Sequence, residues 1–236
     1  MGKDQIIRQI SDYSEIFPII WGELGTGAGQ KALDLGVGSK ALSAKQMLDH
    51  KLKVVGIDID PDCLVHSDEL GFPIHICDAC SLPFEDDSFD FSLAFFSMHE
   101  IDPKKHLDVL SEMKRVSKKA VVIEPLPNTD EIGKIYDKIW QEAMDSVGKF
   151  EIYQPMNYWA SLMSRLGPKK IFQFRLKLTK MVTETNVEDF CKQSIEHFKK
   201  IGVNNRFIDE INDLAEKTKI NGMKHADVII IIGTFN

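Results

Sequence analysis

Four residues that could bind a charged, ribose-containing ligand follow two neighbouring apolar runs: Asp34, Gly36, Gly38 and Asp58. The two glycines permit backbone conformations and close approaches that a side chain would block. A helix that starts behind such a turn attracts a carboxylate or a phosphate to its N-terminus. Asp58 ends the next apolar run, where its carboxylate can accept hydrogen bonds from both hydroxyls of a ribose. The pattern therefore predicts a nucleoside-binding site.

Two classes of cofactor fit this turn, because Gly36, Gly38 and Ala41 also satisfy the Gly-x-Gly-x-x-Ala fingerprint of dinucleotide-binding proteins. Asp34 favours one of them. Its carboxylate would repel a pyrophosphate but would attract the ammonium and sulfonium charges of S-adenosylmethionine. We therefore expect S-adenosylmethionine, with S-adenosylhomocysteine as its product. A nicotinamide-dependent oxidoreductase and a non-catalytic scaffold of the same fold are the alternatives.

The apolar runs alternate with polar, helix-compatible segments, which is typical of an α/β domain with a mostly parallel sheet. The runs are nearly continuous, so both faces of each strand should be covered by helices. The expected fold is therefore a Rossmann-like, doubly wound sheet. We expect its strands at residues 31–35, 53–57, 74–77, 89–96, 120–123 and 227–235.

Two late segments differ in how deeply they are expected to lie in the sheet. Residues 172–179 alternate apolar and polar side chains, which predicts an edge strand with one wet face. Val228–Ile232 has no polar face, so we expect this last strand inside the sheet. We expect one domain over residues 1–236. It comprises an N-terminal helical segment at 1–30, a cofactor-binding core at 31–125 and helical insertions at 129–166 and 186–222 that form a lid.

Composition narrows the class of protein. The 236 residues carry a formal net charge of -7, which argues against a nucleic-acid partner held by its phosphates. The N-terminus lacks a signal-peptide pattern and the four cysteines read as reduced thiols, so we expect a cytoplasmic location. No apolar run approaches the length of a membrane span. No sequence feature indicates an oligomeric state.

Residues 77–90 carry a family resemblance. Asp78 and Ala79 precede a Leu82-Pro83-Phe84 turn, and a Phe-Asp pair at 89–90 opens the next strand. These motifs resemble the class I methyltransferases of the small-molecule type known as type 11, best over residues 31–125. The resemblance implies a reversed last strand inserted in the sheet. It also implies roles for cofactor-binding residues: Asp34, Gly36, Val37 and Gly38 on the methionine side, Asp58 at the ribose, Ile59, Asp78 and Ala79 at the adenine, and Phe95 near the sulfonium.

One residue departs from the family pattern. Lys40 stands where the family usually has a third glycine. It could narrow the turn near the carboxylate of the cofactor, or it could pair with that carboxylate.

The catalytic candidate is His99, which follows the fourth apolar run at the edge where open α/β sheets bind ligands. It could act as a base or contact the acceptor, or it could cap a helix. Glu124 is placed similarly after the fifth run, as a substrate contact or as an anchor for a loop. Direct displacement of a methyl group needs little acid–base machinery, because alignment of the reactants supplies much of the rate.

Aromatic residues in the helical segments could line a pocket for a small-molecule acceptor, although such residues more often belong to a core. The candidates are Tyr13, Trp140, Tyr153, Tyr158 and Trp159. No metal is expected, since Cys77-x-x-Cys80 supplies only one pair with ligand spacing. The basic run at 165–180 is interpreted as a solvated edge strand, with an anionic acceptor or RNA as its alternative.

Overall fold

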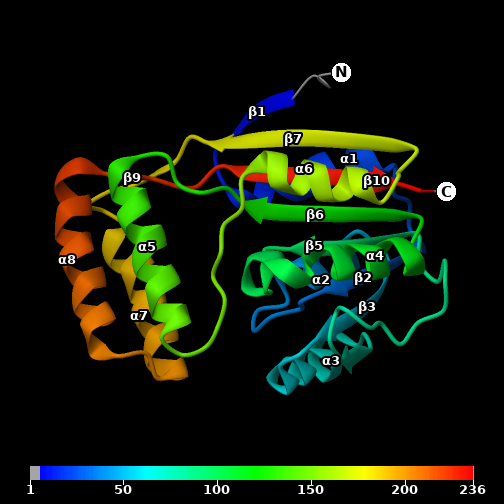
Figure 1. The fold of residues 1–236 in the computed structure, drawn as a ribbon, viewed down its shortest axis with the longest axis horizontal. Coiled ribbons are helices and arrows are strands. Elements are labelled where there is room, and N and C mark those ends of the chain that lie inside the picture. Colours follow the sequence, from blue (N-terminus) through cyan, green and yellow to red (C-terminus); the bar gives the residue numbers. More distant parts are fainter. Residues whose placement is uncertain (1–5, 236) are drawn as a thin grey trace.

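A computed structural model describes residues 6–235 and centres on an eight-stranded sheet in the order β1-β7-β10-β6-β5-β2-β3-β4 (Figure 1). β10 runs antiparallel to both of its neighbours, and the other seven strands are parallel to one another. The strands are β1 Ile6–Ile10, β2 Lys31–Leu35, β3 Lys53–Asp58, β4 Ile74–Ile76, β5 Phe91–Phe95, β6 Lys119–Pro125, β7 Lys170–Leu178 and β10 Val228–Thr234. The expected Rossmann-like sheet with a reversed, inserted last strand is confirmed.

Helices cover both faces of the sheet (Figure 1). On one face pack α1 Ile16–Leu24, α2 Leu42–Asp49 and the segment containing α3 Val65–Leu70; on the other pack α4 His106–Val116 and α6 Met156–Arg165. A lobe beside the sheet consists of α5 Glu131–Asp145, α7 Val187–Ile201, α8 Asn205–Asn221 and the small pair β8 Met181–Val182 and β9 Met223–Lys224. Short 3-10 helices lie at Tyr13–Glu15, Pro61–Leu64, Met98–Glu100 and Pro103–Lys105.

β10 shows why a strand without a polar face belongs inside the sheet. Val228, Ile230 and Ile232 pack against the layer that contains α1, whereas Ile229 and Ile231 pack against the layer that contains α6. All five side chains are at most 1% exposed. Burying each isoleucine contributes about 1.5–3 kcal/mol to the stability of the fold. Because successive side chains point to opposite faces, the strand takes part in both cores.

The N-terminal segment differs from the expectation. Residues 6–10 of the expected helical segment form β1, which pairs in parallel with β7 and makes β1 the edge of the sheet. The edge position expected for residues 172–179 was therefore wrong. Their alternation has another cause: Phe174 and Leu176 face the α1 layer, while Arg175 points to the less covered face and pairs with Asp227 at 2.7 Å.

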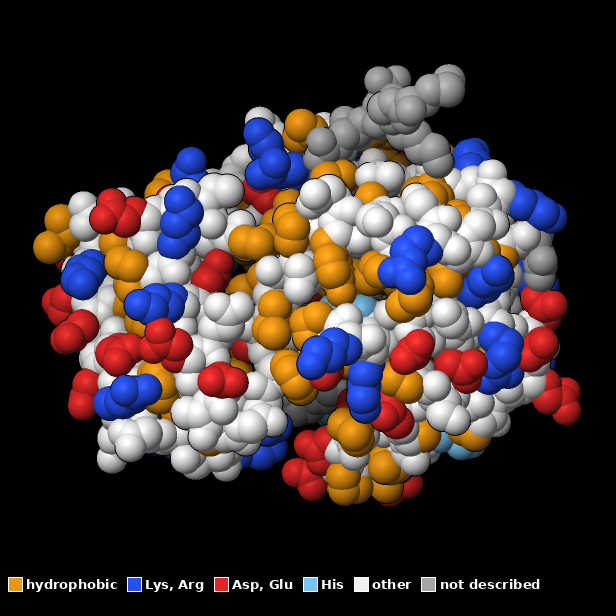
Figure 2. All heavy atoms as spheres, viewed as in Figure 1, with side chains coloured by type: hydrophobic (Ala, Val, Ile, Leu, Met, Phe, Trp, Pro, Cys, Tyr) orange, Lys and Arg blue, Asp and Glu red, His pale blue; other side chains and the backbone are white. Residues whose placement is uncertain are grey.

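The two insertions expected to form a lid separate into different structural units. α6 is a helix of the main body, because Trp159, Leu162 and Met163 are buried in the same core as Ile231. The apolar face of α6 thus packs on the sheet, and the lid stays a prediction for the remaining insertion helices. α5, α7 and α8 have a core of their own, in which Phe198, Phe207 and other side chains are buried. Figure 2 shows that charges of both signs are intermixed over this lobe. No helix within residues 6–235 is long and apolar enough to cross a membrane.

The turn after β2 yields a prediction about stability. A Cβ atom on Gly36 would lie 2.6 Å from the Ser97 Cβ, and the Gly36 φ is +77°. Gly38 has a similar φ of +66° but open space around its Cα. We expect Gly36→Ala to lower the free energy of unfolding by about 2–4 kcal/mol and Gly38→Ala by about 1 kcal/mol, because only the first adds a steric overlap to backbone strain. Urea denaturation measures both, and equal losses would contradict the close packing.

Candidate active site

The glycine turn and Asp58 lie against each other. The Asp58 Oδ2 accepts a hydrogen bond of 2.8 Å from the Gly38 N–H, and its Oδ1 accepts one of 2.9 Å from the Asp60 N–H. Both bonds come from the backbone, so they fix the direction of the carboxylate. Each oxygen retains a second lone pair that could accept a hydroxyl. The geometry fits a ribose diol held beside the turn.

Asp34 lies beneath this turn and is fully buried. Its Oδ2 accepts a hydrogen bond of 2.8 Å from the Ser43 hydroxyl. Ser43 belongs to the first turn of α2, so this bond attaches the start of the helix to the end of β2. Burial, with a smaller contribution from Asp58, raises the Asp34 pKa to about 7. The Asp34 Oδ1 is buried without a hydrogen-bond partner, as expected of a group that a cationic ligand would complete.

The residues predicted to hold the adenine follow β3 and β4. The backbone bond from the Cys77 N–H to the Asp58 carbonyl, 3.0 Å long, brings these two strand ends together. Ile59 is 76% exposed, an apolar side chain that a flat ring could cover. The Asp78 Oδ1 accepts from the Cys80 N–H at 2.9 Å, and its Oδ2 lies 3.3 Å from the Lys105 Nζ. The Asp78 side chain is exposed and the neighbouring Ala79 is partly exposed, so a ligand could reach both.

Three other residues discussed from the sequence do not direct their side chains at the proposed cofactor site. Val37 is buried behind the turn, 2.6 Å from a Cβ built on Gly56, so its backbone alone can face a ligand. Lys40 is exposed, and its carbonyl accepts a hydrogen bond from the Lys45 Nζ. Phe95 stacks between Phe17 and Phe96 in the core.

Phe96 is a ring that the sequence analysis did not single out. Its φ of +52° turns the chain at the end of β5, and its side chain lines a cavity. Strained backbone of this kind concentrates at functional sites. No sequence pattern identified Phe96, because its neighbour Phe95 has the same side chain.

His99 and Glu124 form a buried pair at the ends of β5 and β6. The Glu124 Oε1 accepts from the N–H groups of Ser97 and Met98 at 3.0 and 2.8 Å, and its Oε2 lies 2.6 Å from the His99 Nδ1. Burial lowers the His99 pKa, but the charges of Glu124 and Glu151 and the hydrogen bond outweigh burial and raise it to about 9. His99 is therefore an imidazolium at neutral pH. Glu124 anchors the loop after β5, not the loop that follows its own strand.

A second carboxylate approaches His99 from the other side. The Glu151 Oε1 lies 3.7 Å from the His99 Nε2 and accepts a hydrogen bond from the Tyr153 hydroxyl. Burial raises the Glu151 pKa, although His99 and Tyr153 oppose that effect. Glu151 was not predicted from the sequence, because it lies in an irregular segment between two helices where neither periodicity nor a motif marks it.

Next to this pair lies a cavity of about 450 Å³ between the sheet and the lobe. Candidates from distant parts of the chain meet there: Tyr13, His99 and Tyr153 line it together with Phe96. Burial raises the Tyr13 pKa to about 12, so its hydroxyl stays protonated at neutral pH. The lobe and the β9 region contribute further lining residues, Tyr136, Asp137, Phe190, Gln193, Lys224 and His225 among them. The size is suitable for a small-molecule ligand.

Three candidate aromatic residues do not line this cavity. The Tyr158 hydroxyl hydrogen-bonds to the His106 Nδ1 at 2.9 Å, on the α4 side of the sheet. Trp159 is buried beside it, and Trp140 packs against Phe198 inside the lobe. All three have structural roles in these contacts. Within residues 6–235, no three His, Cys, Asp or Glu side chains are grouped so that they could hold a metal ion.

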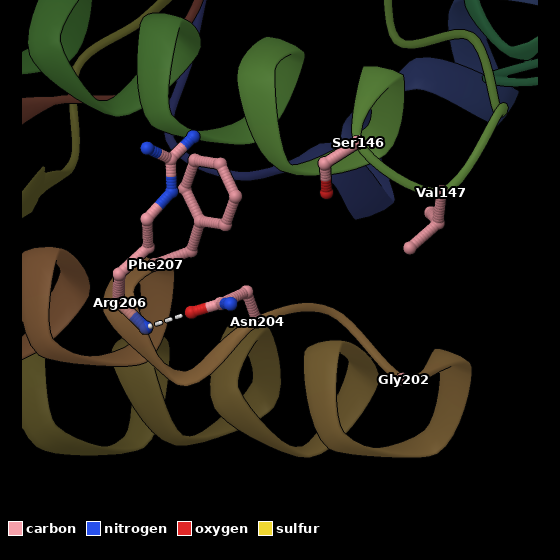
Figure 3. Close-up of a pocket in the computed structure, with 6 residues that line it drawn as sticks. All are labelled: Ser146, Val147, Gly202, Asn204, Arg206 and Phe207. Atoms are coloured by element: carbon pink, nitrogen blue, oxygen red, sulfur yellow. Dashed lines mark hydrogen bonds between the residues drawn. The ribbon is translucent and has the colours of Figure 1, made fainter.

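A separate recess of about 460 Å³ lies on the lobe (Figure 3). It is lined by Ser146, Val147, Gly202, Asn204, Arg206 and Phe207. The Asn204 side chain accepts from the Arg206 N–H at 2.9 Å to cap α8, and the Arg206 guanidinium lies over the Phe207 ring. These contacts stabilise the start of the helix.

The buried Asp34 yields a prediction about pH. Because its pKa is raised from 3.8 to about 7, its favourable contribution to stability is complete below pH 3.8 and is lost as the pH rises through 7. We expect Asp34→Asn to stabilise the unliganded protein at pH 8 by at most about 4 kcal/mol, since one pKa unit corresponds to about 1.4 kcal/mol. Thermal unfolding from pH 5 to pH 8 measures this.

The matched control is Asp90→Asn. Lys118 lowers the Asp90 pKa, and the two side chains lie 2.8 Å apart, so the Asp90 carboxylate stabilises the fold above its ordinary pKa and that contribution is lost on acidification. Its substitution should destabilise the protein at pH 8. A decrease in stability for both variants would show that ionised Asp34 carries no cost in the folded state.

Known proteins share this fold. A family described as a methyltransferase domain matches residues 33–123. Demethylmenaquinone methyltransferase of Staphylococcus saprophyticus is 28% identical over 138 residues, which cover 54% of this chain and 58% of that relative. The match therefore spans little more than half of each protein.

Solved structures resemble the chain over nearly its whole length. YcgJ of Bacillus subtilis has a TM-score of 0.65 at 15% identity, covering 95% of this chain and 99% of that one. Phosphoethanolamine N-methyltransferase 2 of Haemonchus contortus, in complex with S-adenosyl-L-methionine, has a TM-score of 0.60 at 15% identity, covering 94% and 53%. Residues 33–123 therefore match the methyltransferase domain family, and the whole chain shares the fold of these solved structures.

Proposed function

We propose that this protein transfers a methyl group from S-adenosylmethionine to a small-molecule acceptor by direct displacement, releasing S-adenosylhomocysteine. The contact between Asp58 and the Gly38 N–H carries the proposal, because it holds a ribose-binding carboxylate against a turn that can receive an amino-acid tail. The family match over residues 33–123 includes both residues and supports this cofactor over a nicotinamide.

The residues of the chain divide the binding of the cofactor among them. Asp34 supplies a buried negative charge beneath the methionine part, Asp58 accepts from the ribose hydroxyls, and Ile59, Asp78 and Ala79 border the adenine. Gly36, Val37 and Gly38 contribute backbone, and Phe95 supports the site from the core by packing against Phe96. The bound cofactor supplies an electrophilic methyl group on a sulfonium.

The aromatic cavity at the ends of β5 and β6 is the proposed acceptor site. It lies beyond Phe96 and His99, on the loop whose Ser97 Oγ donates to the Leu35 carbonyl at 2.9 Å directly before the glycine turn. The loop that contains Phe96, Ser97 and His99 thus connects the proposed acceptor site to the proposed cofactor site. The relative and the solved structure described above are named for demethylmenaquinone and phosphoethanolamine, which supports a small molecule as the acceptor.

Substitution of Asp58 tests the cofactor assignment. We expect Asp58→Ala to weaken the binding of S-adenosylhomocysteine by about 2–3 kcal/mol, roughly thirtyfold to more than a hundredfold, because two charge-assisted hydrogen bonds are lost. Isothermal titration calorimetry measures the affinity. Asp60→Ala is the control, since it removes an exposed carboxylate but keeps the Asp60 N–H. Unchanged affinity in the Asp58 variant, or tighter binding of NADH than of S-adenosylhomocysteine by the unsubstituted protein, would overturn the proposal.

A further inference from the structure

The segment between α5 and α6 brings a buried acid to the acceptor cavity. The Ile152 N–H donates a hydrogen bond of 2.9 Å to the His99 carbonyl, which attaches this segment to the loop after β5. Glu151, one residue earlier, is only 7% exposed. Its side chain therefore meets the His99 ring, while Tyr153, two residues later, lines the cavity.

Neither His99 nor Glu124 is free to accept a proton from an acceptor. His99 is already an imidazolium at neutral pH, with its two ring nitrogens facing Glu124 and Glu151. Glu124 receives three donors, the N–H groups of Ser97 and Met98 and the His99 ring. His99 as a general base, one role expected from the sequence, is therefore disfavoured by its own surroundings.

Glu151 differs from Glu124 in its partners. The Tyr153 hydroxyl donates to its Oε1, and the charge of His99 lies 3.7 Å from the same oxygen. Glu151 does not itself line the cavity, whereas Tyr153 does, so the Tyr153 hydroxyl connects the cavity to a buried carboxylate. Burial also raises the Glu151 pKa, which makes it a stronger base than an exposed carboxylate.

The walls of the cavity indicate the shape of the acceptor. Its rings touch in sequence: Phe96 and Tyr13 have centroids 5.4 Å apart, Tyr13 and His225 6.1 Å, His225 and Phe190 5.9 Å, and Phe190 and Tyr136 5.1 Å. A continuous aromatic wall suits a flat ring, which can stack on it or meet it edge-on. Burial lowers the His225 pKa, so this ring is neutral at neutral pH.

We propose that Tyr153 and Glu151 form a proton relay that deprotonates a hydroxylated aromatic acceptor, an inference that rests on the proposed methyl transfer. As the acceptor O–H gives its proton to the Tyr153 oxygen, Tyr153 passes its own proton to the Glu151 Oε1. The acceptor oxygen bonds to the methyl carbon as the carbon–sulfur bond breaks, and that electron pair stays on sulfur. Glu151 releases the proton to solvent after the product leaves, so each turnover releases one proton.

A chromogenic phenol tests the relay without knowledge of the natural acceptor. 4-Nitrophenol absorbs visible light only as its phenolate, so absorbance reports its ionisation. We expect the protein loaded with S-adenosylhomocysteine to bind it as the phenolate at a pH at least one unit below its pKa in water. In Glu151→Gln and in Tyr153→Phe we expect the ratio of bound phenolate to bound neutral phenol at that pH to fall by about tenfold or more, which corresponds to one pKa unit.

The titration must separate Glu151 from its neighbours. The titratable groups that face it are His99, Glu100, Glu124, Tyr136 and Tyr153. Glu151→Asp, which keeps the acid, should recover part of the ionisation. Glu188→Gln removes the same charge from an exposed position that pairs with Lys219, and it should leave the ionised fraction unchanged.

Several results would overturn the relay. They are failure of 4-nitrophenol to bind, binding as the neutral phenol in the unsubstituted protein, and an unchanged ionised fraction in Glu151→Gln. Thermal unfolding and S-adenosylhomocysteine titration of each variant show that it is folded and loaded. If the unsubstituted protein ionised 4-nitrophenol but did not bind S-adenosylhomocysteine, the proposed methyl transfer would fail, although proton transfer to Tyr153 and Glu151 would be supported. If the protein bound S-adenosylhomocysteine but did not ionise 4-nitrophenol, only the relay would be overturned.

Discussion

The hydrogen bonds of the buried Glu124 carboxylate position both the glycine turn and the aromatic cavity, the two proposed binding sites. This carboxylate holds the N–H groups of Ser97 and Met98 and the ring of His99, and these three residues form the first turn after β5. Ser97 in turn packs on Gly36 beside the cofactor turn, whereas the His99 carbonyl receives the Ile152 N–H beside the acceptor cavity. A single acid at the end of β6 thus holds the glycine turn and the aromatic cavity in a fixed arrangement. Such alignment is the main requirement of a displacement reaction.

The sequence was most informative where one residue type has one physical use. The apolar runs predicted the strands of the sheet from β2 to β6, and the run without a polar face at 228–232 predicted an inserted strand, because burial on both faces leaves no other arrangement. The glycine turn and Asp58 also lie together as expected from their spacing. Their roles toward a cofactor stay predictions.

The sequence was less informative where long-range contacts decide the outcome. Residues 6–10 have no strong period, and their strand exists because β7 offers an open edge and because Arg8 reaches both Glu23 and the Phe174 ring. Glu151 becomes interesting only after an irregular segment has crossed to His99. Phe95 and Phe96 look alike in the sequence, and the left-handed backbone of Phe96 alone decides which ring faces the cavity. Propensity and periodicity describe neighbours in the chain, and these three cases depend on neighbours in space.

The pairing of the first strand with the seventh has a consequence for biosynthesis. Ile6 emerges from the ribosome early, but its register partner Phe174 belongs to the last third of the chain, and β10 beside β7 comes later still. Tyr13 follows β1 directly, so this wall of the acceptor cavity can be placed only when translation is nearly complete. The glycine turn needs only β2, β3, β5 and β6, all within the first 125 residues, and can form well before that. A nascent chain would therefore be able to form the proposed nucleoside site before the proposed acceptor site exists.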